Sequence, residues 1–196
     1  MAHALRGSTA VVGVGHGGMG EAPGRTSLEI IAEAVAAALA DAGLSLSDVD
    51  GLFTGTAQHF MPTLSVAEYL GIAPRWSDGS MIGGSSFVAH VLNATLALDA
   101  GLCDVALVCY GSNQRTAGGR LVSMSEPAPH EAIYGPRYPI TAYALAAGRH
   151  MHDFGTTREN LAEVAVAARA WARLNPEAFA REALSVEDVL SSRMVS

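Results

Sequence analysis

The chain has 196 residues, a formal net charge of −7 and an apolar fraction of 49%. This length suits one domain or part of a larger one, and the apolar fraction favours a packed core over disorder. The acidic balance and the lack of any basic block argue against nucleic acid or an anionic membrane surface as a partner. No apolar stretch approaches the roughly 20 residues of a membrane span, and no signal-peptide pattern is visible.

Strand and helix signals alternate through the first part of the chain. A capping box, Thr26–Glu29, opens an Ala-rich helix of about 16 residues that ends at Gly43. The helix expected over 85–100 carries few charges, which is typical of a helix buried on several sides. The expected elements are strands over 9–15, 49–56, 78–82 and 105–110, and helices over 26–43, 65–70 and 85–100. The order β-α-β-α-β-α-β predicts an α/β fold with a parallel sheet.

The pattern changes after this region. Residues 111–139 carry Gly, Ser, Pro and Arg without a clear period, and so long a loop is usually functional. Helices are expected over 140–154 and 157–175, the second of them opened by a capping box, Thr156–Glu159. A short helical turn is expected from Ser185, and no further strand follows.

A glycine-rich motif follows the first expected strand. Gly13-Val-Gly-His-Gly-Gly18 matches the dinucleotide-binding pattern GxGxxG. That motif works only where a helix begins at the glycines and directs its N-terminus at the pyrophosphate. Here Pro23 and Gly24 intervene before the helix cap at Thr26, so we expect an ordinary loop.

The cysteines and the paired histidines favour structural roles. Cys103 and Cys109 fall in or beside one expected strand, which would hold them too far apart for a disulfide. A free cysteine is most often a small buried apolar residue, and a reduced pair suits the cytoplasm. His150 and His152 are two residues apart on an expected helix, so they do not share a face. No metal site is expected.

The turn Gly83-Gly84-Ser85-Ser86 precedes the helix of low charge, and two interpretations remain open. The glycines could simply allow tight packing while a serine caps the helix. Alternatively, backbone N–H groups of 84–86 at the helix start could hold a developing anion. His90 is spaced to reach Ser86, but a buried helix leaves little room for substrate beside such a pair.

Several stretches together resemble the thiolase superfamily, and most closely its sterol-carrier-protein-2 thiolase and bacterial lipid-transfer branch. The matching stretches cover nearly the whole chain and are 10–15, 25–29, 49–54, 83–89, 100–108, 142–157, 161–166, 174–176 and 186–190. The most specific of them reads Ala-Tyr-Ala-Leu-Ala-Ala-Gly-Arg-His-Met-His-Asp-Phe-Gly-Thr-Thr over 142–157.

The resemblance implies a layered α-β-α half of a two-half fold, with residues 1–110 as its core and 111–196 as a helical insertion, the loop domain. The C-terminal half, which carries a histidine in this family, is absent from the chain. We therefore expect a truncated protein or one subunit of a split enzyme. The family usually forms dimers.

The thiolase nucleophile is missing. Members of this family carry an acyl-accepting cysteine in a pattern like Cys-x-x-Gly-x-x-Ala at the start of the buried helix. Alignment on Ala89 places that position at Gly83, and alignment on Gly101 places it at Gly84. Glycine holds no acyl group, so the resemblance excludes Claisen-type thiolysis by the usual covalent route.

Cysteine-free members of this branch act on steroid side chains in lipid metabolism as retro-aldolases and pair with a zinc-ribbon/OB partner of the DUF35 type. The resemblance thus implies a C–C lyase that splits a β-hydroxyacyl-CoA, with a coenzyme A thioester as substrate and no bound cofactor. The turn at Gly84, Ser85 and Ser86 would hold the enolate. The base would come from the missing half or, by chemistry alone, from His130, Tyr134 or Tyr138.

Two other functions stay open. The chain could be a non-catalytic subunit that binds acyl-CoA or lipid, or that serves assembly, because both nucleophile and second half are missing. It could also be an acyltransferase with a nucleophile elsewhere, at Ser85 or Cys109.

Overall fold

The computed structural model describes residues 5–56, 58–116 and 129–195. The chain divides into two compact units, Met1–Val122 and Ser123–Ser196. The predicted division at residue 110, between the core and the loop domain, stays a prediction. Asn113 lies with the first unit, because its side chain donates to the Arg25 carbonyl and accepts from Gln58 Nε2.

The first unit is built from alternating helices and strands, and the described part of the second contains helices alone. The first unit comprises α1 (Ser27–Ala42), a 3₁₀ turn (Leu46–Asp48), β1 (Gly51–Thr54), α2 (Pro62–Leu70), β2 (Trp76–Asp78), α3 (Ser86–Asp99) and β3 (Ala106–Cys109). The second comprises α4 (Pro129–Ala132), α5 (Ile140–Phe154), α6 (Arg158–Leu174) and α7 (Val186–Leu190).

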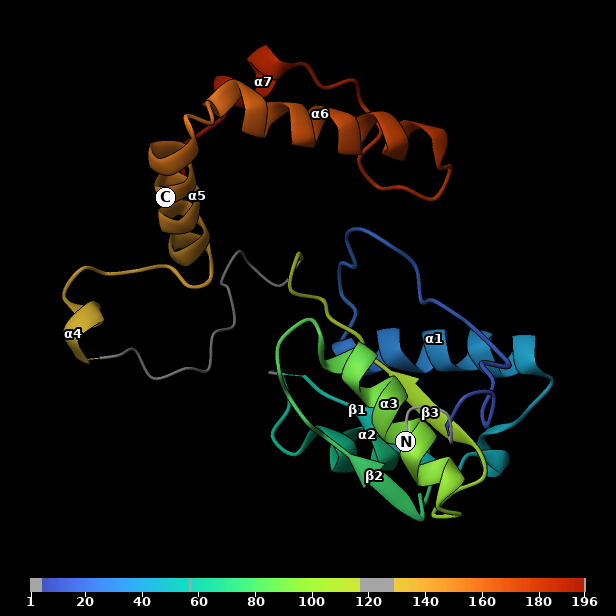
Figure 1. Ribbon diagram of the computed structural model, residues 1–196. Helices are drawn as coiled ribbons and strands as arrows, with labels where there is room; N and C mark the ends of the chain where they lie inside the picture. Colours follow the sequence, from blue (N-terminus) through green and yellow to red (C-terminus); the bar gives the residue numbers. More distant parts are fainter. Residues whose placement is uncertain (1–4, 57, 117–128, 196) are drawn as a thin grey trace. The chain divides into compact units, whose positions relative to one another are not determined.

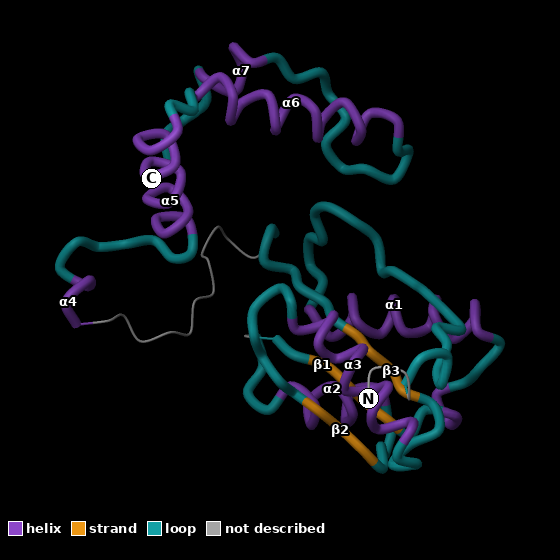
Figure 2. Tube along the Cα trace, in the orientation of Figure 1, coloured by secondary structure: helices purple, strands orange, loops and turns teal. Residues whose placement is uncertain are grey.

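The three strands form a parallel sheet in the order β2-β1-β3 (Figures 1 and 2). Gly51 at the start of β1 lies opposite Trp76 of β2 and Ala106 of β3. All four residues of β1 are buried, as expected of a central strand. The parallel pairing confirms the predicted α/β fold class.

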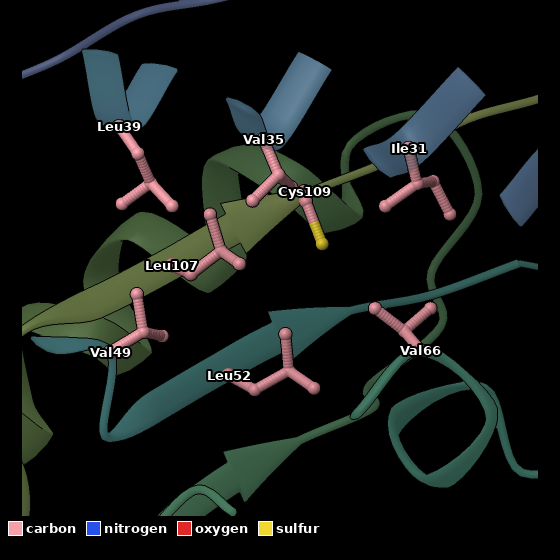
Figure 3. Close-up of a cluster of buried hydrophobic side chains, with 8 residues drawn as sticks. All are labelled: Ile31, Val35, Leu39, Val49, Leu52, Val66, Leu107 and Cys109. Atoms are coloured by element: carbon pink, nitrogen blue, oxygen red, sulfur yellow. The ribbon is translucent and has the colours of Figure 1, made fainter. Parts of the chain in front are cut away.

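Helices cover both faces of this sheet, which gives the predicted α-β-α layering. Successive side chains of a strand point to opposite faces. Leu52 and Leu107 therefore pack with α1 and α2, whereas Phe53 and Val108 pack toward α3. Figure 3 shows the first of these clusters, in which the Ile31, Val35 and Leu39 side chains of α1 point down onto Leu107, Cys109 and their neighbours.

Side-chain caps start the helices near the predicted positions. Thr26 and Glu29 form the predicted capping box of α1, and Gly43 ends the helix in the left-handed conformation. The cap of α6 differs by one residue from the prediction. Thr157, with Asn160 as its partner, makes the box in place of Thr156 and Glu159, because Thr157 adopts the extended cap conformation.

The predicted strand over 9–15 is wrong, because no described strand pairs with it. The segment runs beside α1 instead: Val14 N–H donates to Asp41 Oδ2 at 2.9 Å, and a Cβ on Gly13 or Gly15 would collide with the helix backbone at Ala38. Val11 is 77% exposed. An apolar run becomes a strand only where a neighbour completes its hydrogen-bond ladder.

Two strand boundaries also differ from the prediction. The β2 strand covers Trp76–Asp78 and not 78–82, since residues 79–85 form the turn that leads into α3. The β1 strand is shorter than 49–56, because the 3₁₀ turn precedes it and its pairing ends at Thr54. The turn over 79–85 is the segment that carries the candidate site.

Candidate functional site

The candidate site lies where the turn before α3 meets the end of β1. A Cβ on Gly55, just after β1, would sit 3.3 Å from the Ser80 carbonyl and 3.2 Å from Met81 Sδ. The turn therefore crosses the carboxyl end of the central strand. In open α/β sheets ligands bind at this end, where the N-termini of the helices also lie.

Ser86 holds the turn together. Its side chain is fully buried, its Oγ donates to the Gly83 carbonyl at 2.7 Å, and the same Oγ accepts from Ile82 N–H at 2.9 Å. The Ser86 N–H also donates to the Gly83 carbonyl. Of the three N–H groups predicted to hold an anion, this one is therefore already used, which leaves those of Gly84 and Ser85.

The Ser86–His90 pair is not formed. Ser86 Oγ bonds within the turn, and His90 Nε2 lies 2.9 Å from the Ser80 carbonyl instead. Ser85 is exposed, and its side chain makes no capping hydrogen bond to α3. A nucleophilic serine needs a base within hydrogen-bond reach, and the described contacts of Ser85 and Ser86 provide none.

The two glycines at the predicted nucleophile position differ in backbone conformation. Gly83 has φ +76°, in the left-handed region, whereas the φ of Gly84 lies outside it. A Cβ at either position would meet no atom within 4 Å. There is therefore room for a side chain at both, but only Gly83 would be strained by one.

We expect Gly83→Ala to lower the free energy of unfolding by about 1 to 2 kcal/mol because alanine disfavours the left-handed conformation. Gly84→Ala should leave it unchanged or raise it by up to about 1 kcal/mol, since alanine restricts the unfolded chain. Urea denaturation measures the free energy of unfolding of both variants, and each variant serves as the control for the other. Equal destabilisation by both would contradict the difference in backbone conformation.

Neither cysteine is placed for nucleophilic chemistry. Cys103 and Cys109 are both free and buried, as predicted. Burial raises the pKa of the Cys109 thiol to about 11. Burial also raises the pKa of Cys103. The nucleophile of thiol chemistry is the thiolate, which these surroundings disfavour.

The three residues proposed as bases lie in the second unit. His130 is on α4, Tyr134 follows that helix, and both are exposed. Tyr138 is half-buried, and its hydroxyl donates to Glu131. Their role as bases stays a prediction.

His150 and His152, the two histidines on α5, contact residues of the same helix. His150 stacks on Phe154, with ring centroids 4.7 Å apart, and His152 Nδ1 lies 3.1 Å from Asp153 on the same helix. Among the described residues, no three His, Cys, Asp or Glu side chains gather as metal ligands would. In the same part of the chain, no helix is both long enough and apolar enough to span a membrane.

Sequence reasoning missed a polar cluster near the start of α1. Ser27 Oγ lies 2.7 Å from His59 Nε2, and Asn113 links Gln58 to the Arg25 carbonyl. These residues come from the start of α1 and the residues just before it, from the loop after β1 and from the loop after β3, so no spacing in the sequence indicates that they meet. The cluster holds the loops after β1 and β3 against the N-terminus of α1.

The fold is of the α/β class. Its parallel sheet has helices on both faces, and a helix N-terminus lies at the carboxyl end of the sheet. Known proteins specify it further. The chain is 34% identical to a steroid side-chain-cleaving aldolase of Thermomonospora curvata, over 97% of this chain and 52% of that protein. It is 33% identical to 17-hydroxy-3-oxo-4-pregnene-20-carboxyl-CoA lyase of Mycobacterium tuberculosis, over 98% of this chain and 53% of that lyase. An acetyl-CoA acetyltransferase of Methanothermobacter thermautotrophicus is 30% identical to this chain, over 95% of this chain and 51% of that enzyme.

Solved structures agree with these relatives. The Ltp2-ChsH2(DUF35) aldolase superposes with a TM-score of 0.79 and 32% identity, covering 95% of this chain and 49% of the matched chain. A monomeric SCP2-thiolase-like protein of Mycobacterium smegmatis superposes with a TM-score of 0.69 over 93% of this chain and 38% of its own; at 24% identity it supports the fold alone. No protein-family profile matches the chain.

In sequence and fold the chain therefore resembles the thiolase-like proteins, as predicted. It spans about half the length of the curated relatives that it matches.

Proposed function

We propose that this chain forms part of an acyl-CoA lyase that cleaves a C–C bond by a retro-aldol reaction. The observation that carries the proposal is glycine at both 83 and 84, at the helix start where a thiolase needs its cysteine. The buried thiols supply no substitute. Two relatives of 33–34% identity are named as an aldolase and a lyase.

The reaction needs no nucleophile from the protein. A base takes the proton of the β-hydroxyl group, the bond between the α and β carbons breaks, and the β carbon becomes a ketone. The electron pair of that bond forms the thioester enolate. Protonation of the α carbon then gives the shorter acyl-CoA, so no oxidant or second substrate takes part.

This chain would contribute the stabilisation of the enolate. The N–H groups of Gly84 and Ser85 lie at the start of a helix of 14 residues, where the backbone favours negative charge. Fixed N–H donors directed at a developing oxyanion are among the strongest catalytic devices. The base would be His130, Tyr134 or Tyr138 of the second unit, or a residue outside this chain.

The exposed side of α3 supports a protein partner. Val88, Val91 and Leu92 are 50–76% exposed, whereas Ala94 and Ala97 of the same helix are buried in the cluster with Phe53. Exposed apolar patches of this kind mark contact surfaces. We propose that the other half of the protein, which relatives possess and this chain lacks, covers this side.

Assembly beyond that half is also a proposal. The solved structure with the higher TM-score of the two is an aldolase with a DUF35 component. We propose a partner of the same type for this protein, together with a homodimer. A coenzyme A thioester would be the substrate, and the cytoplasm, where such thioesters are processed, would be its location.

The test is a cleavage assay on the assembled protein that contains this chain. The probe is 17-hydroxy-3-oxo-4-pregnene-20-carboxyl-CoA, the thioester in the name of one relative. In it the 17-hydroxyl lies on the carbon β to the thioester, so a retro-aldol reaction yields a 17-ketone and propionyl-CoA in equal amounts. Chromatography with mass detection measures both products.

The same assay separates the alternatives. Thiolysis of a β-ketoacyl-CoA by free coenzyme A would instead support the acyltransferase function, which the similarity to an acetyl-CoA acetyltransferase keeps in view. Tight thioester binding without turnover would support the non-catalytic subunit. Either result would contradict the lyase proposal.

A further inference from the structure

Three polar side chains form a stripe along α3. Ser86, His90 and Asn93 are spaced four and three residues apart, which places them on one face of the helix. Ser86 and His90 are fully buried, and Asn93 is half-buried. Buried polar groups are costly unless they are hydrogen-bonded, so their partners show what the stripe does.

All three bond to residues 78–83, which comprise the end of β2 and the first part of the turn that leads into α3. Asn93 Nδ2 donates to Asp78 Oδ2, His90 Nε2 bonds to the Ser80 carbonyl at 2.9 Å, and Ser86 Oγ bonds to Ile82 and Gly83. Residues with higher numbers in α3 bond to residues with lower numbers in this segment. The segment therefore runs antiparallel to α3.

The first two contacts are linked through Asp78. Its Oδ1 accepts from both the N–H and the Oγ of Ser80, at 2.8 and 2.7 Å. Burial tends to raise the pKa of Asp78, but the hydrogen bonds from Ser80 and Asn93 and the nearby His90 outweigh it and lower the pKa. Asn93 and His90 of the stripe therefore bond to groups that are themselves hydrogen-bonded to each other, namely Asp78 and Ser80.

The contact of His90 shows which of its ring nitrogens donates a hydrogen bond. A carbonyl oxygen only accepts, so the hydrogen in the bond to Ser80 belongs to His90 Nε2. Nδ1 is buried and has no hydrogen-bond partner among the described residues. Around the ring lie Phe53 and Phe87, with centroids 6.4 and 5.8 Å away. The one described polar role of this imidazole is to hold the Ser80 carbonyl.

We infer that the stripe positions the turn of the candidate site and that His90 is its central positioning residue. By holding Ser80, His90 sets the course of the chain toward Gly83 and Gly84. The placement of the N–H groups that meet the enolate then depends on it. This inference rests on the proposed lyase function for its effect on turnover, but not for its effect on the turn itself.

Three substitutions test the inference in the assembled protein. In His90→Gln the side-chain N–H lies about where Nε2 lies, so the donor to Ser80 is kept, whereas His90→Asn is too short and His90→Phe has no donor. We expect His90→Gln to keep at least a third of the wild-type kcat. The other two should lose about 10- to 100-fold, as small misplacements of catalytic groups do, with KM changing less than about threefold.

Cys103→Ala is the control for stability. Cys103 is 1% exposed in the apolar cluster that α3 forms with β1, and it makes no contact with the turn. Its loss weakens the packing of α3 but should leave kcat within about twofold of wild type. A fall in kcat with Cys103→Ala as large as with His90→Asn would overturn the inference. So would wild-type turnover in His90→Asn, or failure of His90→Gln to retain activity.

A spectroscopic readout separates this inference from the lyase proposal. In ¹⁵N NMR spectra the wild-type His90 should show a protonated Nε2 that is bonded to the Ser80 carbonyl. The Gly83 and Gly84 amide resonances should move in His90→Asn and stay in His90→Gln. If the protein cleaves no thioester, the lyase proposal fails, and these resonances still decide whether His90 positions the turn. Unmoved glycine resonances in all variants would overturn it.

Discussion

Thiol reagents should leave both cysteines of the folded protein unmodified. A thiol with a pKa of about 11, as Cys109 has, carries about 300-fold less thiolate at neutral pH than one with the ordinary pKa of about 8.5. Burial of the sulfur slows its reaction further. We expect iodoacetamide to label Cys109 at least about 100-fold more slowly in the native protein than in urea, as followed by mass spectrometry.

The labelling experiment bears directly on the reaction type. If Cys109 carried an acyl group during turnover, Cys109→Ala would abolish activity and acyl-CoA would leave a mass adduct on the wild type. The lyase proposal expects neither, and Ser85→Ala checks the other nucleophile proposed from the sequence. Rapid native labelling of Cys109, or an acyl adduct on it, would instead favour the acyltransferase.

Asp50→Ala should lower the free energy of unfolding by about 2 to 3 kcal/mol. Asp50 Oδ1 accepts from the backbone N–H groups of Asp104 and Val105, each at 2.8 Å, so it joins the start of β1 to the start of β3. Its Oδ2 accepts from Arg75 at 3.0 Å. Hydrogen bonds to a charged group contribute about 1.5 to 3 kcal/mol, and alanine would leave both N–H groups without a partner.

Asp104→Asn is the matched control for Asp50. Asp104 pairs with the same arginine at 3.2 Å, but its side chain is 82% exposed. Exposed ion pairs contribute about 0 to 1 kcal/mol, so this variant should stay within about 0.5 kcal/mol of wild type in urea denaturation. If the two variants were equally destabilised, the arginine pair and not the backbone bonds would hold the strands.

The effect of Asp50 should depend on pH in one direction. Burial tends to raise its pKa, but the hydrogen bonds from Val105, Asp104 and Arg75 outweigh burial and lower the pKa in the folded state. A lowered folded pKa stabilises the protein above the unfolded value of about 3.9, and this contribution is lost as the pH falls toward the folded value. The stability difference between wild type and Asp50→Ala should therefore shrink below about pH 4. A constant difference down to acid pH would contradict this role.

Local signals in the sequence were enough for most of the helices. Capping at Thr26, the left-handed Gly43 and the bounds of α5 all depend on neighbouring residues, and the structure has them as predicted. The same holds for the burial of Cys103 and Cys109. These features are readable because the residues that cause them lie within a turn or two of one another.

The segment over 9–15 shows where such reading fails. Its apolar pattern is that of a strand, yet a strand also needs a neighbour that supplies hydrogen bonds, and the described strands supply none. The local pattern is the same whether or not that neighbour is present. Pairing between distant strands can therefore be predicted only when the whole sheet is known.

The sequence by itself determined the fold class and the likeness to the thiolase superfamily, because both depend on which residues stand in short stretches of chain. The loss of the thiolase nucleophile at Gly83 or Gly84 stays a prediction. Only the tertiary structure decided what the polar groups of the candidate site do. Ser86 was open to capping, catalysis or packing until its bonds to Ile82 and Gly83 were seen. His90 was matched with Ser86 by helical spacing, but its partner is Ser80, ten residues away along the chain. A side chain chooses its partner from everything that folding brings near it, and spacing along one helix covers only a small part of that choice.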